Sequence, residues 1–563
     1  MLLSNLDLLA TAPGGAAKLR ELILTLAVQG KLVPQDPADE PASVLLQKIR
    51  AEKDRLIAEG KIKRDKPLAE IAEEEKPFEL PAGWEWVRLG DITNYGTTTK
   101  VERLQPDTWV LDMEDIEKSS GRLLQRLRFA QRPALSDKNC FLAGDVLYGK
   151  LRPYLNKVLV ADEDGVCTTE VIPFRCYGNY VPQYFRLVLS SPFFLEYVNA
   201  RSYGMKMPRL GTEDARKSVI PLPPLAEQSR IVTRVEALMR LCDALEAKGQ
   251  LEAAQHAQLV STLLGTLTAS TTPEELAENW QRVAQHFDLL LDRPEAIDAL
   301  EQTLLQLAVR GLLVPQDPTD EPASALLQKI RTEKDRLIAT GQLKRDKPLP
   351  PVSDEEKPFA LPDGWEWARF GELILSSDAG WSPSCESTPR EGNEWGVLKV
   401  SAVSWGEFRP EENKALPAGL FPKPEFEVKP EDFLLSRANT EELVARSVIA
   451  WEPPGRLMMS DKLIRLRLSS HIDKALYCEI NNSRLSRDYY IVNASGTSSS
   501  MKNVSREVIL KLMVPVPPAP EQSRIVARVA ELRALCVQLH NRLATTAQTR
   551  SRLAEALLEQ AVA

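Results

Sequence analysis

The stretch LAVQGKLVPQDPADEPASVLLQKIRAEKDRLIAEGKIKRDKPL, residues 26–68, decides how this chain is organised, because it occurs twice. The second copy, residues 307–349, reads LAVRGLLVPQDPTDEPASALLQKIRTEKDRLIATGQLKRDKPL. The match extends through KPFELPAGWEW (76–86) and KPFALPDGWEW (357–367). Two related structural units are therefore expected.

A second pair of related stretches lies further along each half. PLPPLAEQSRIVTRVEALMRLCDAL (221–245) returns as PVPPAPEQSRIVARVAELRALCVQL (515–539). Between the doublets, residues 87–220 and 368–514 barely resemble each other. Similar flanks around dissimilar interiors indicate shared supports that carry two different functional domains.

Length and composition limit the class of protein. With 563 residues and 43% hydrophobic side chains, the chain can form several buried cores. No apolar run reaches the roughly 18 residues of a transmembrane helix, and the first residues lack the basic region of a signal peptide. The 7 cysteines are scattered without metal-ligand spacing, which fits a reducing compartment. We therefore expect a cytoplasmic protein with no metal site and no membrane partner.

The charge is distributed unevenly along the chain. The net charge is −8, which argues against a simple basic nucleic-acid binder. Residues 84–220 contain 19 Lys and Arg against 17 Asp and Glu, and residues 365–514 contain 19 against 21. The variable segments are thus nearly neutral, so any phosphate contact is expected there, through local clusters rather than net charge.

The duplicated stretches have helical patterns. Leucines between residues 19 and 26 predict a helix over about 16–28 that stops at Gly30, and a second helix is predicted from Pro41 to Gly60. The later doublet has a heptad seam, formed by Ile231, Val235, Leu238, Cys242 and Leu245 in one copy and by Ile525, Val529, Leu532, Cys536 and Leu539 in the other. Two matched seams favour pairing of the two long helices over packing of each helix on its own domain.

The variable segments contain runs typical of strands. These runs are residues 109–113, 145–148, 156–161 and 169–174 in the first segment, and 396–403, 432–436, 446–451 and 462–468 in the second. A helix is expected around 182–197. The fold class is therefore α+β, with two mixed α/β domains separated by long helices that pair as an antiparallel coiled coil, and with a pseudo-two-fold internal repeat. The expected parts are a helical repeat (1–75), domain 1 (76–220), a central helical region (221–356), domain 2 (357–514) and a C-terminal helix (515–563).

The motifs LAVxGxLVPQDPxDEPAS, KPFxLPxGWEW and PLPPLAEQSRIV resemble the specificity subunit of type I restriction-modification enzymes over essentially the whole chain. The resemblance implies two target recognition domains, each reading one half of a bipartite, asymmetric sequence in double-stranded DNA. It implies helices that set the spacing and dock two modification (methyltransferase) subunits, while restriction (motor-nuclease) subunits join for cleavage. S-adenosylmethionine, ATP and Mg would then belong to partner subunits, with no cofactor on this chain.

Candidate DNA contacts are polar and basic side chains in loops and at strand ends, since Lys, Arg and hydroxyl groups bind phosphates while Arg and Asn read base edges. In the first variable segment they are Thr98, Lys100, Lys150, Arg152, Tyr154, Asn156, Lys157, Tyr203, Lys206 and Arg209. In the second they are Ser436, Arg437, Asn439, Thr440, Lys462, Ser499, Ser500, Lys502 and Asn503. A plain surface turn is the alternative for the stretch 144–157, and a flexible Ser-rich loop is the alternative for 494–503.

Catalytic motifs are missing from the sequence. GDVLYGKLRPYLNK (144–157) matches the start of a phosphate-binding loop, but Leu151 replaces the Mg-binding Ser or Thr and Pro153 interrupts the following helix. We find no GxSxG, no HExxH and no NPPY-like or FxGxG pattern of amino-methyltransferases. A non-catalytic chain is predicted. Two alternatives stay open: a coiled-coil scaffold with two protein-binding domains, and a self-contained modification enzyme with an unrecognised catalytic site.

Overall fold

The computed structural model describes residues 12, 14–100, 103–132, 138–204, 206–345, 347–385, 387–404, 406–498 and 501–562. The chain forms two compact units. Unit 1 consists of Met1–Ala253 and Thr546–Ala563, and unit 2 of Ala254–Thr545. Two long helices, α8 (Leu225–Ala269) and α17 (Ala519–Val562), contribute residues to both units. Within the described ranges, no helix combines the length and apolar character needed to cross a bilayer.

The first copy of the repeat forms two helices in unit 1, α2 (Gly15–Val28) and α3 (Ala42–Ala58), with Pro41 as the residue that precedes α3. The turn after α2 needs glycine at position 30. Gly30 has a φ of +70°, and a Cβ there would lie 2.5 Å from the Pro81 ring. Gly311 repeats this arrangement against Pro362 in unit 2, at 2.6 Å. In both units the repeat helix therefore packs closely against the KPFxLPxGWEW stretch, residues 76–86 and 357–367.

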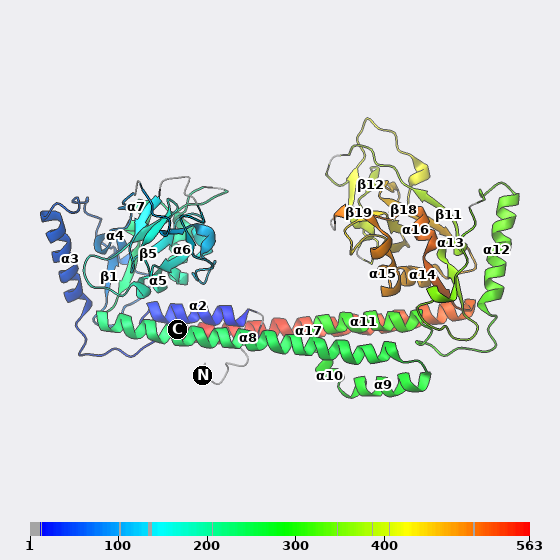
Figure 1. Cartoon of the computed structure of the whole chain (residues 1–563), viewed down its shortest axis with the longest axis horizontal. Coiled ribbons are helices and arrows are strands. Elements are labelled where there is room, and N and C mark those ends of the chain that lie inside the picture. The colour runs from blue at the N-terminus through cyan, green and yellow to red at the C-terminus, as the bar shows by residue number, and fades with distance from the viewer. Residues whose placement is uncertain are drawn as a thin grey trace. The chain divides into compact units, whose positions relative to one another are not determined.

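Variable domain 1 lies between two strands that pair antiparallel, β1 (Glu85–Arg88) and β9 (Val219–Leu222), so the chain enters and leaves it at one place. One sheet has the order β3 (Leu127–Arg128), β2 (Trp109–Leu111), β7 (Gly165–Thr168), β4 (Lys138–Phe141). The other has the order β6 (Val158–Val160), β5 (Val146–Gly149), β8 (Val171–Phe174). The helices of the domain are α4 (Leu89–Ile92), α5 (Pro182–Ser190), α6 (Pro192–Arg201) and α7 (Thr212–Lys217) (Figure 1).

The four strands expected in variable domain 1 coincide with β2, β5, β6 and β8. The helix expected around 182–197 is divided into α5 and α6 at Ser191 and Pro192. Proline lacks the backbone N–H that would continue α5, and the Ser191 hydroxyl instead accepts a bond from Phe194 N to cap α6.

Unit 2 contains the helices that precede and form the second repeat, α9 (Pro273–Gln285), α10 (Phe287–Leu290), α11 (Pro294–Val309) and α12 (Ala323–Ala339). Variable domain 2 lies between β10 (Glu366–Arg369) and β21 (Met513–Val516), which pair as β1 and β9 do. Its helices are α13 (Phe370–Leu373), α14 (Lys474–Asn482), α15 (Arg484–Asn493) and α16 (Arg506–Lys511).

The described residues of variable domain 2 form three sheets between β10 and β21. The first has the order β11 (Ile374–Ala379), β18 (Leu463–Leu468), β14 (Asp432–Ser436), β16 (Ser447–Ala450). The second has the order β13 (Asn413–Ala415), β12 (Gly396–Leu398), β17 (Leu457–Met458). The third has the order β15 (Ala438–Asn439), β20 (Met501–Asn503), β19 (Ser495–Ser498). The strand expected over 396–403 ends at Leu398, and a 3-10 turn, Val400–Val403, follows it.

The duplicated stretches of each unit meet at one buried carboxylate. In unit 1, Trp84 Nε1 and Gln35 Nε2 donate to Glu227, at 2.9 and 3.0 Å. In unit 2, Trp365 and Gln316 donate to Glu521, at 3.0 and 3.1 Å. Both carboxylates are 1% exposed. Burial raises the pKa of both groups, and the two donors partly offset this effect.

The neighbouring glutamine holds the variable domain through backbone groups. Gln228 Oε1 accepts from Val181 N at 3.2 Å, and its Nε2 donates to Pro223 O at 3.1 Å. In unit 2, Gln522 Oε1 accepts from Asp473 N at 2.8 Å, and its Nε2 donates to Pro517 O at 3.0 Å. The Glu-Gln pair at the start of each long helix therefore joins the helix, the repeat and the variable domain.

Residues of each expected seam are buried within their own unit. Ile231, Val235 and Cys242 belong to the core of unit 1, together with apolar residues of α2 such as Ile23 and Ala27. In unit 2, Ile525 and Val529 belong to the core of variable domain 2. Cys536, with Leu532 and Leu539 against it, shares a cluster with Leu300 and Leu304 of α11 and with Val260 and Leu264 of α8. Within each unit the seam residues therefore pack on other apolar residues of that unit, and inside unit 2 α17 packs against a later part of α8; the pairing of the two seams stays a prediction.

Ion pairs between each repeat helix and its long helix have opposite polarity in the two units. In unit 1 the cation is on the repeat helix: Arg20 of α2 binds Asp243 and Glu246 of α8, both at 2.5 Å. In unit 2 the acid is on the repeat helix: Glu301 of α11 binds Arg533 of α17 at 2.5 Å. Arg20 and Glu301 occupy the same position of the repeat, six residues before Leu26 and Leu307.

Candidate nucleic-acid interface

Two of the stretches predicted separately in variable domain 1 converge at the end of β5. Leu210 N donates to Lys150 O at 3.0 Å, and Arg152 N donates to Pro208 O at 2.7 Å. Tyr203 and Arg209 exchange backbone bonds across a short turn, at 2.9 and 3.1 Å. The strand end and the loop over 203–210 therefore form one surface.

Exposed aromatic and basic side chains lie on this surface. Tyr154 and Tyr203 are 49% and 61% exposed, Lys206 is exposed, and Lys150 is half-buried. Glu170 binds Arg209 at 3.0 Å and raises the pKa of that guanidinium. Arg and Lys tips beside aromatic rings suit phosphate contact and stacking on sugar or base.

Two predicted residues have contacts within the domain instead. Asn156 is 7% exposed, has a φ of +50°, and donates from Nδ2 to Ser190 O at 3.0 Å. Lys157 donates from Nζ to Met113 O at 2.6 Å, and burial lowers its pKa. Because the buried Asn156 holds the turn after β5, we revise its DNA-contact assignment to a structural one, whereas that of the half-buried Lys157 stays a prediction.

Thr98 and Lys100 lie apart from the surface at the end of β5. Lys100 forms a bridge with Asn139 of β4, and Cys140 N donates to Thr99 O at 2.8 Å. The stretch over 97–100 therefore continues the β4 edge of the four-stranded sheet, where Lys100 is exposed and Thr98 half-buried.

Variable domain 2 repeats the backbone arrangement of variable domain 1. Arg437 N donates to Lys462 O at 2.7 Å, as Lys150 N does to Glu170 O at 2.9 Å. Val504 N donates to Arg437 O at 3.0 Å, matching Leu210 and Lys150. Ala438 pairs with Asn503 as Leu151 pairs with Arg209. Two domains with dissimilar sequences thus present side chains from equivalent positions.

The predicted residues of variable domain 2 divide into two groups. Arg437, Lys462 and Asn503 are exposed at the converging strands. Two others, Ser436 and Asn439, are bound inside the domain. Ser436 is 0% exposed and donates to Leu443 O at 2.8 Å, so its assignment as a DNA contact is corrected. Asn439 donates to Ser404 Oγ and accepts from Thr440 N, both at 2.8 Å.

Lys502 also has partners inside variable domain 2. Its Nζ lies 3.5 Å from Glu441 and 3.4 Å from Gly496 O. Thr440 is half-buried. Ser499 and Ser500 lie outside the described residues.

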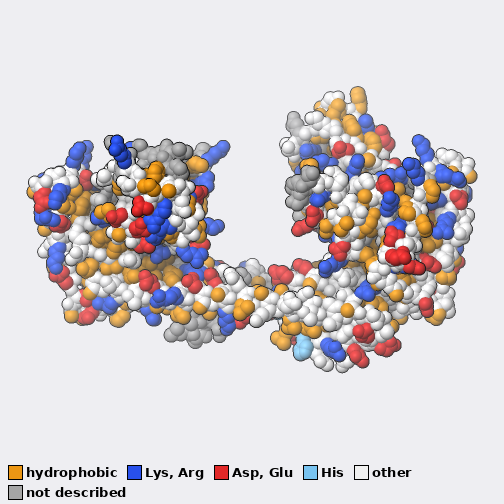
Figure 2. All heavy atoms as spheres, viewed as in Figure 1, with side chains coloured by type: hydrophobic (Ala, Val, Ile, Leu, Met, Phe, Trp, Pro, Cys, Tyr) orange, Lys and Arg blue, Asp and Glu red, His pale blue; other side chains and the backbone are white. Residues whose placement is uncertain are grey.

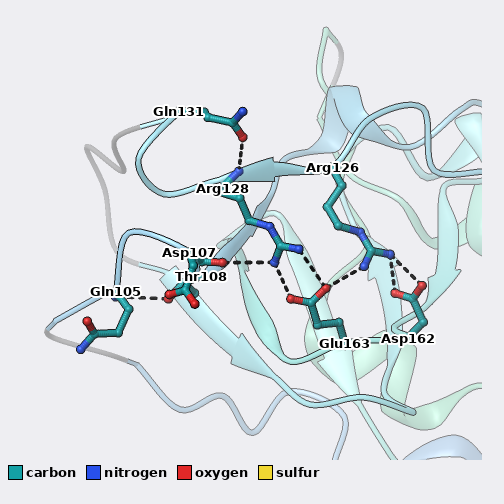
Figure 3. Close-up of polar contacts among 8 residues, drawn as sticks. All are labelled: Gln105, Asp107, Thr108, Arg126, Arg128, Gln131, Asp162 and Glu163. Carbon is teal, nitrogen blue, oxygen red and sulfur yellow. Dashed lines mark hydrogen bonds and ion pairs between the residues drawn. The ribbon is translucent and has the colours of Figure 1, made fainter.

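A charged network on β3 was missed by the sequence reasoning (Figure 3). Arg126 binds Asp162 at 2.6 Å and Glu163 at 2.7 Å, and Arg128 also binds Glu163. The guanidinium of Arg126 stacks on the Trp109 ring, with its carbon 4.4 Å from the ring centroid. The arginines lower the pKa of both carboxyl groups. The alternating LQRLRF run was the available signal, but pairing leaves this strand with little free positive charge.

No cluster of three or more His, Cys, Asp or Glu side chains with metal-binding geometry occurs in the described parts of the chain. Residues 144–157 do not fold as a phosphate-binding loop, because residues 146–149 form strand β5 and a 3-10 turn, Pro153–Leu155, follows.

Comparison with known proteins decides the family. A family model described as type I restriction modification DNA specificity domain matches residues 81–255. The EcoEI specificity subunit of Escherichia coli is 43% identical over 97% of this chain and 94% of its own length. The EcoAI specificity subunit of Escherichia coli is 38% identical over the same shares, 97% and 94%.

The chain belongs to the specificity subunits of type I restriction enzymes. A specificity subunit is the non-catalytic, DNA-recognising component of a restriction-modification complex. Two solved structures are also similar. One, titled for complex assembly and conformational transition of the type I R-M system, covers 86% of this chain and 99% of its own at 21% identity, with a TM-score of 0.49. The HsdS subunit from Thermoanaerobacter tengcongensis covers 86% and 98% at 20% identity, with a TM-score of 0.38.

Proposed function

We propose that this specificity subunit reads a bipartite, asymmetric sequence in double-stranded DNA, one half with each variable domain. The observation that carries the proposal is the shared backbone arrangement with different side chains at equivalent positions. Lys150, Glu170 and Arg209 in domain 1 correspond to Arg437, Lys462 and Asn503 in domain 2. Arginine pairs with guanine and asparagine with adenine, so such a change of side chains gives different half-sites on one scaffold.

The helical regions are proposed to set the distance between half-sites and to dock the partners. Helices α8 and α17 contain 45 and 44 residues, which corresponds to roughly 65 Å at a rise of about 1.5 Å per residue. Half-sites one or two helical turns apart are about 34 to 70 Å apart. The repeated surfaces suit two copies of one partner, the modification subunit, and restriction subunits join this complex for cleavage. S-adenosylmethionine, ATP and Mg belong to those partners.

Methylation mapping tests the proposal directly. Genomes are compared between cells that make this chain with its modification subunits and cells that make the modification subunits alone. We expect one bipartite, asymmetric methylated motif that appears only with the chain. An active modification complex that leaves no new motif would contradict sequence reading by this subunit.

A further inference from the structure

The repeats contain two matching basic segments that the sequence reasoning did not assign to DNA. They are KIKRDK at 61–66 and QLKRDK at 342–347. In the first, Lys63, Arg64 and Lys66 are exposed. In the second, Lys344, Arg345 and Lys347 are exposed at the matching positions. We call these the first and the second basic segment.

These cations are not neutralised by the protein. Among the described residues, Lys63, Arg64, Lys66, Lys344 and Arg345 make no hydrogen bond or ion pair. The lack of a partner distinguishes these five cations from most cations nearby and in the variable domains, such as the paired arginines of the β3 network. On the face seen in Figure 2, acidic and basic side chains are interspersed.

The acids next to the first basic segment are already bound. Glu59 pairs with Arg55 at 2.8 Å and with Lys61 at 2.7 Å. Asp65, inside the segment, pairs with Arg216 at 2.6 Å. The segment therefore presents a net positive charge to solvent although the whole chain carries −8.

The ion pair between Asp65 and Arg216 places the first basic segment beside the candidate interface. Arg216 belongs to α7, which begins two residues after the loop over 203–210. Lys53 of α3 also reaches toward the carbonyls of Gly90 and Asp91, at 3.5 and 3.3 Å. In unit 2, Lys334 donates to Gly371 O at 2.6 Å, and Leu349 and Leu510 both pack at Gly371. Leu510 is on α16, so the second basic segment runs beside the helix that corresponds to α7.

The basic segments match between the two units while the side chains at the converging strands beside them differ, and this difference indicates what the segments bind. The side chains at the converging strands differ between the two domains, as two different half-sites require, whereas the basic segments beside them match. Backbone phosphates are the same at every DNA sequence, so a contact to them is served by the same residues in both copies.

We propose that the two basic segments bind the phosphate backbone of duplex DNA next to each half-site, independently of its sequence. This rests on the proposed function, and it moves part of the phosphate contact from the variable domains to the repeats. Lys63, Arg64 and Lys66 form one contact set, and Lys344, Arg345 and Lys347 form the other. The rest of each repeat stays available to the modification subunits.

The test uses the complex of this chain with its modification subunits. The variant carries Lys63→Ala, Arg64→Ala, Lys66→Ala, Lys344→Ala, Arg345→Ala and Lys347→Ala. Its matched control carries Lys48→Ala, Lys76→Ala and Lys248→Ala with Lys329→Ala, Lys357→Ala and Arg528→Ala, six cations that are ion-paired in the structure. The charge change is equal, so the comparison contrasts the two basic segments with ion-paired cations elsewhere in the chain.

Dissociation constants are measured from about 50 to 300 mM KCl on the mapped target duplex and on a scrambled duplex of equal length. We expect the variant to lose at least about tenfold affinity at low salt on both duplexes, with a salt slope reduced by about 0.9 per lost contact. The control is expected to stay within about twofold of wild type, and the ratio of target to scrambled binding to stay constant.

Three outcomes separate the possible failures. Unchanged affinity and slope in the variant, with target selectivity intact, overturns the inference and leaves the proposed function standing. Loss of modification subunits from the variant, seen in the mass of the complex, also overturns it, because the segments then bind an acidic protein surface. A wild-type complex without target selectivity would refute the proposed function, while the loss on the scrambled duplex would still support the phosphate contact.

Discussion

At the scale of single residues, the buried carboxylates Glu227 and Glu521 hold each unit together through donors from distant stretches. Trp365 Nε1 donates to Glu521, whereas Trp367 Nε1 is buried without a hydrogen-bond partner. We expect Trp365→Phe to lower the free energy of unfolding by about 2 kcal/mol more than Trp367→Phe, since only the first removes a bond to a charged group. Urea unfolding followed by circular dichroism measures both; equal losses would show that the indole–carboxylate bond contributes little.

The same carboxylates make stability depend on pH. Burial raises the pKa of Glu227 and Glu521 above the ordinary value of 4.5. The folded chain then keeps protons that the unfolded chain has released, so this contribution to stability falls as pH rises from 4.5 through the raised pKa. Replacing both residues by Gln removes the titration.

The measurement is the difference in unfolding free energy between wild type and the double Gln variant. We expect the unfolding free energy of wild type to fall relative to that of the double Gln variant as the pH rises from about 5 to 7. Glu70→Gln with Glu74→Gln, two exposed positions, provides the control and should give a flat difference. A flat difference for the buried pair as well would mean that its pKa is not raised.

Single positions also mark where sequence reasoning stops. Polar residues at strand ends were predicted as DNA contacts, and for Lys150 and Arg437 this stays a prediction. For Asn156 and Ser436 the polar groups point into the domain, because the positive φ at Asn156 and the 0% exposure of Ser436 depend on the folded turn. Residue type predicts what a side chain can bind, but the turn decides which way it faces.

At the scale of helices and strands, the opposite polarity of the ion pairs has a measurable effect. Arg20→Glu places an acid opposite Asp243 and Glu246, so we expect a loss of about 1 kcal/mol in unfolding free energy at low salt. Adding Asp243→Lys and Glu246→Lys recreates the polarity of unit 2 and should restore most of it. Arg50→Glu reverses an exposed charge on α3 and is expected to be nearly neutral.

Thermal unfolding at about 50 and 500 mM salt distinguishes this explanation from simple packing loss, because screening weakens exposed charge pairs. The cost of Arg20→Glu should shrink at high salt. A cost that is independent of salt would mean that the aliphatic part of Arg20, not its charge, supports α2 on α8.

Elements were predictable to different degrees. Runs of β-branched and aromatic residues located β2, β5, β8, β14 and β18, and the heptad pattern located the buried face of both long helices. The pattern did not reveal what covers that face, because α2 and α11 offer apolar residues as suitable as those of a second seam. Periodicity reports that a face is buried; the choice among several apolar partners depends on tertiary packing.

At the scale of the whole molecule, two domains of equal architecture on matching supports should be exchangeable. We expect replacement of residues 368–514 by the corresponding domain of another specificity subunit to change one half of the methylated motif and to leave the other half unaltered. Methylation mapping provides the measurement, and a variant carrying only Trp367→Phe provides a control for minor disturbance. A change in both halves would contradict independent reading.

The Glu-Gln pair at the start of each long helix has a consequence for how such chains diversify. Gln228 and Gln522 grip the domains at the amides of Val181 and Asp473, and the entering and leaving strands pair through main-chain bonds. Every amino acid except proline offers that amide, so the attachment tolerates almost any mutation in the attached domain. The attachment is therefore independent of side-chain identity. The DNA-reading residues can mutate, or a whole variable domain can be replaced by a foreign one, while the supporting helices stay unchanged.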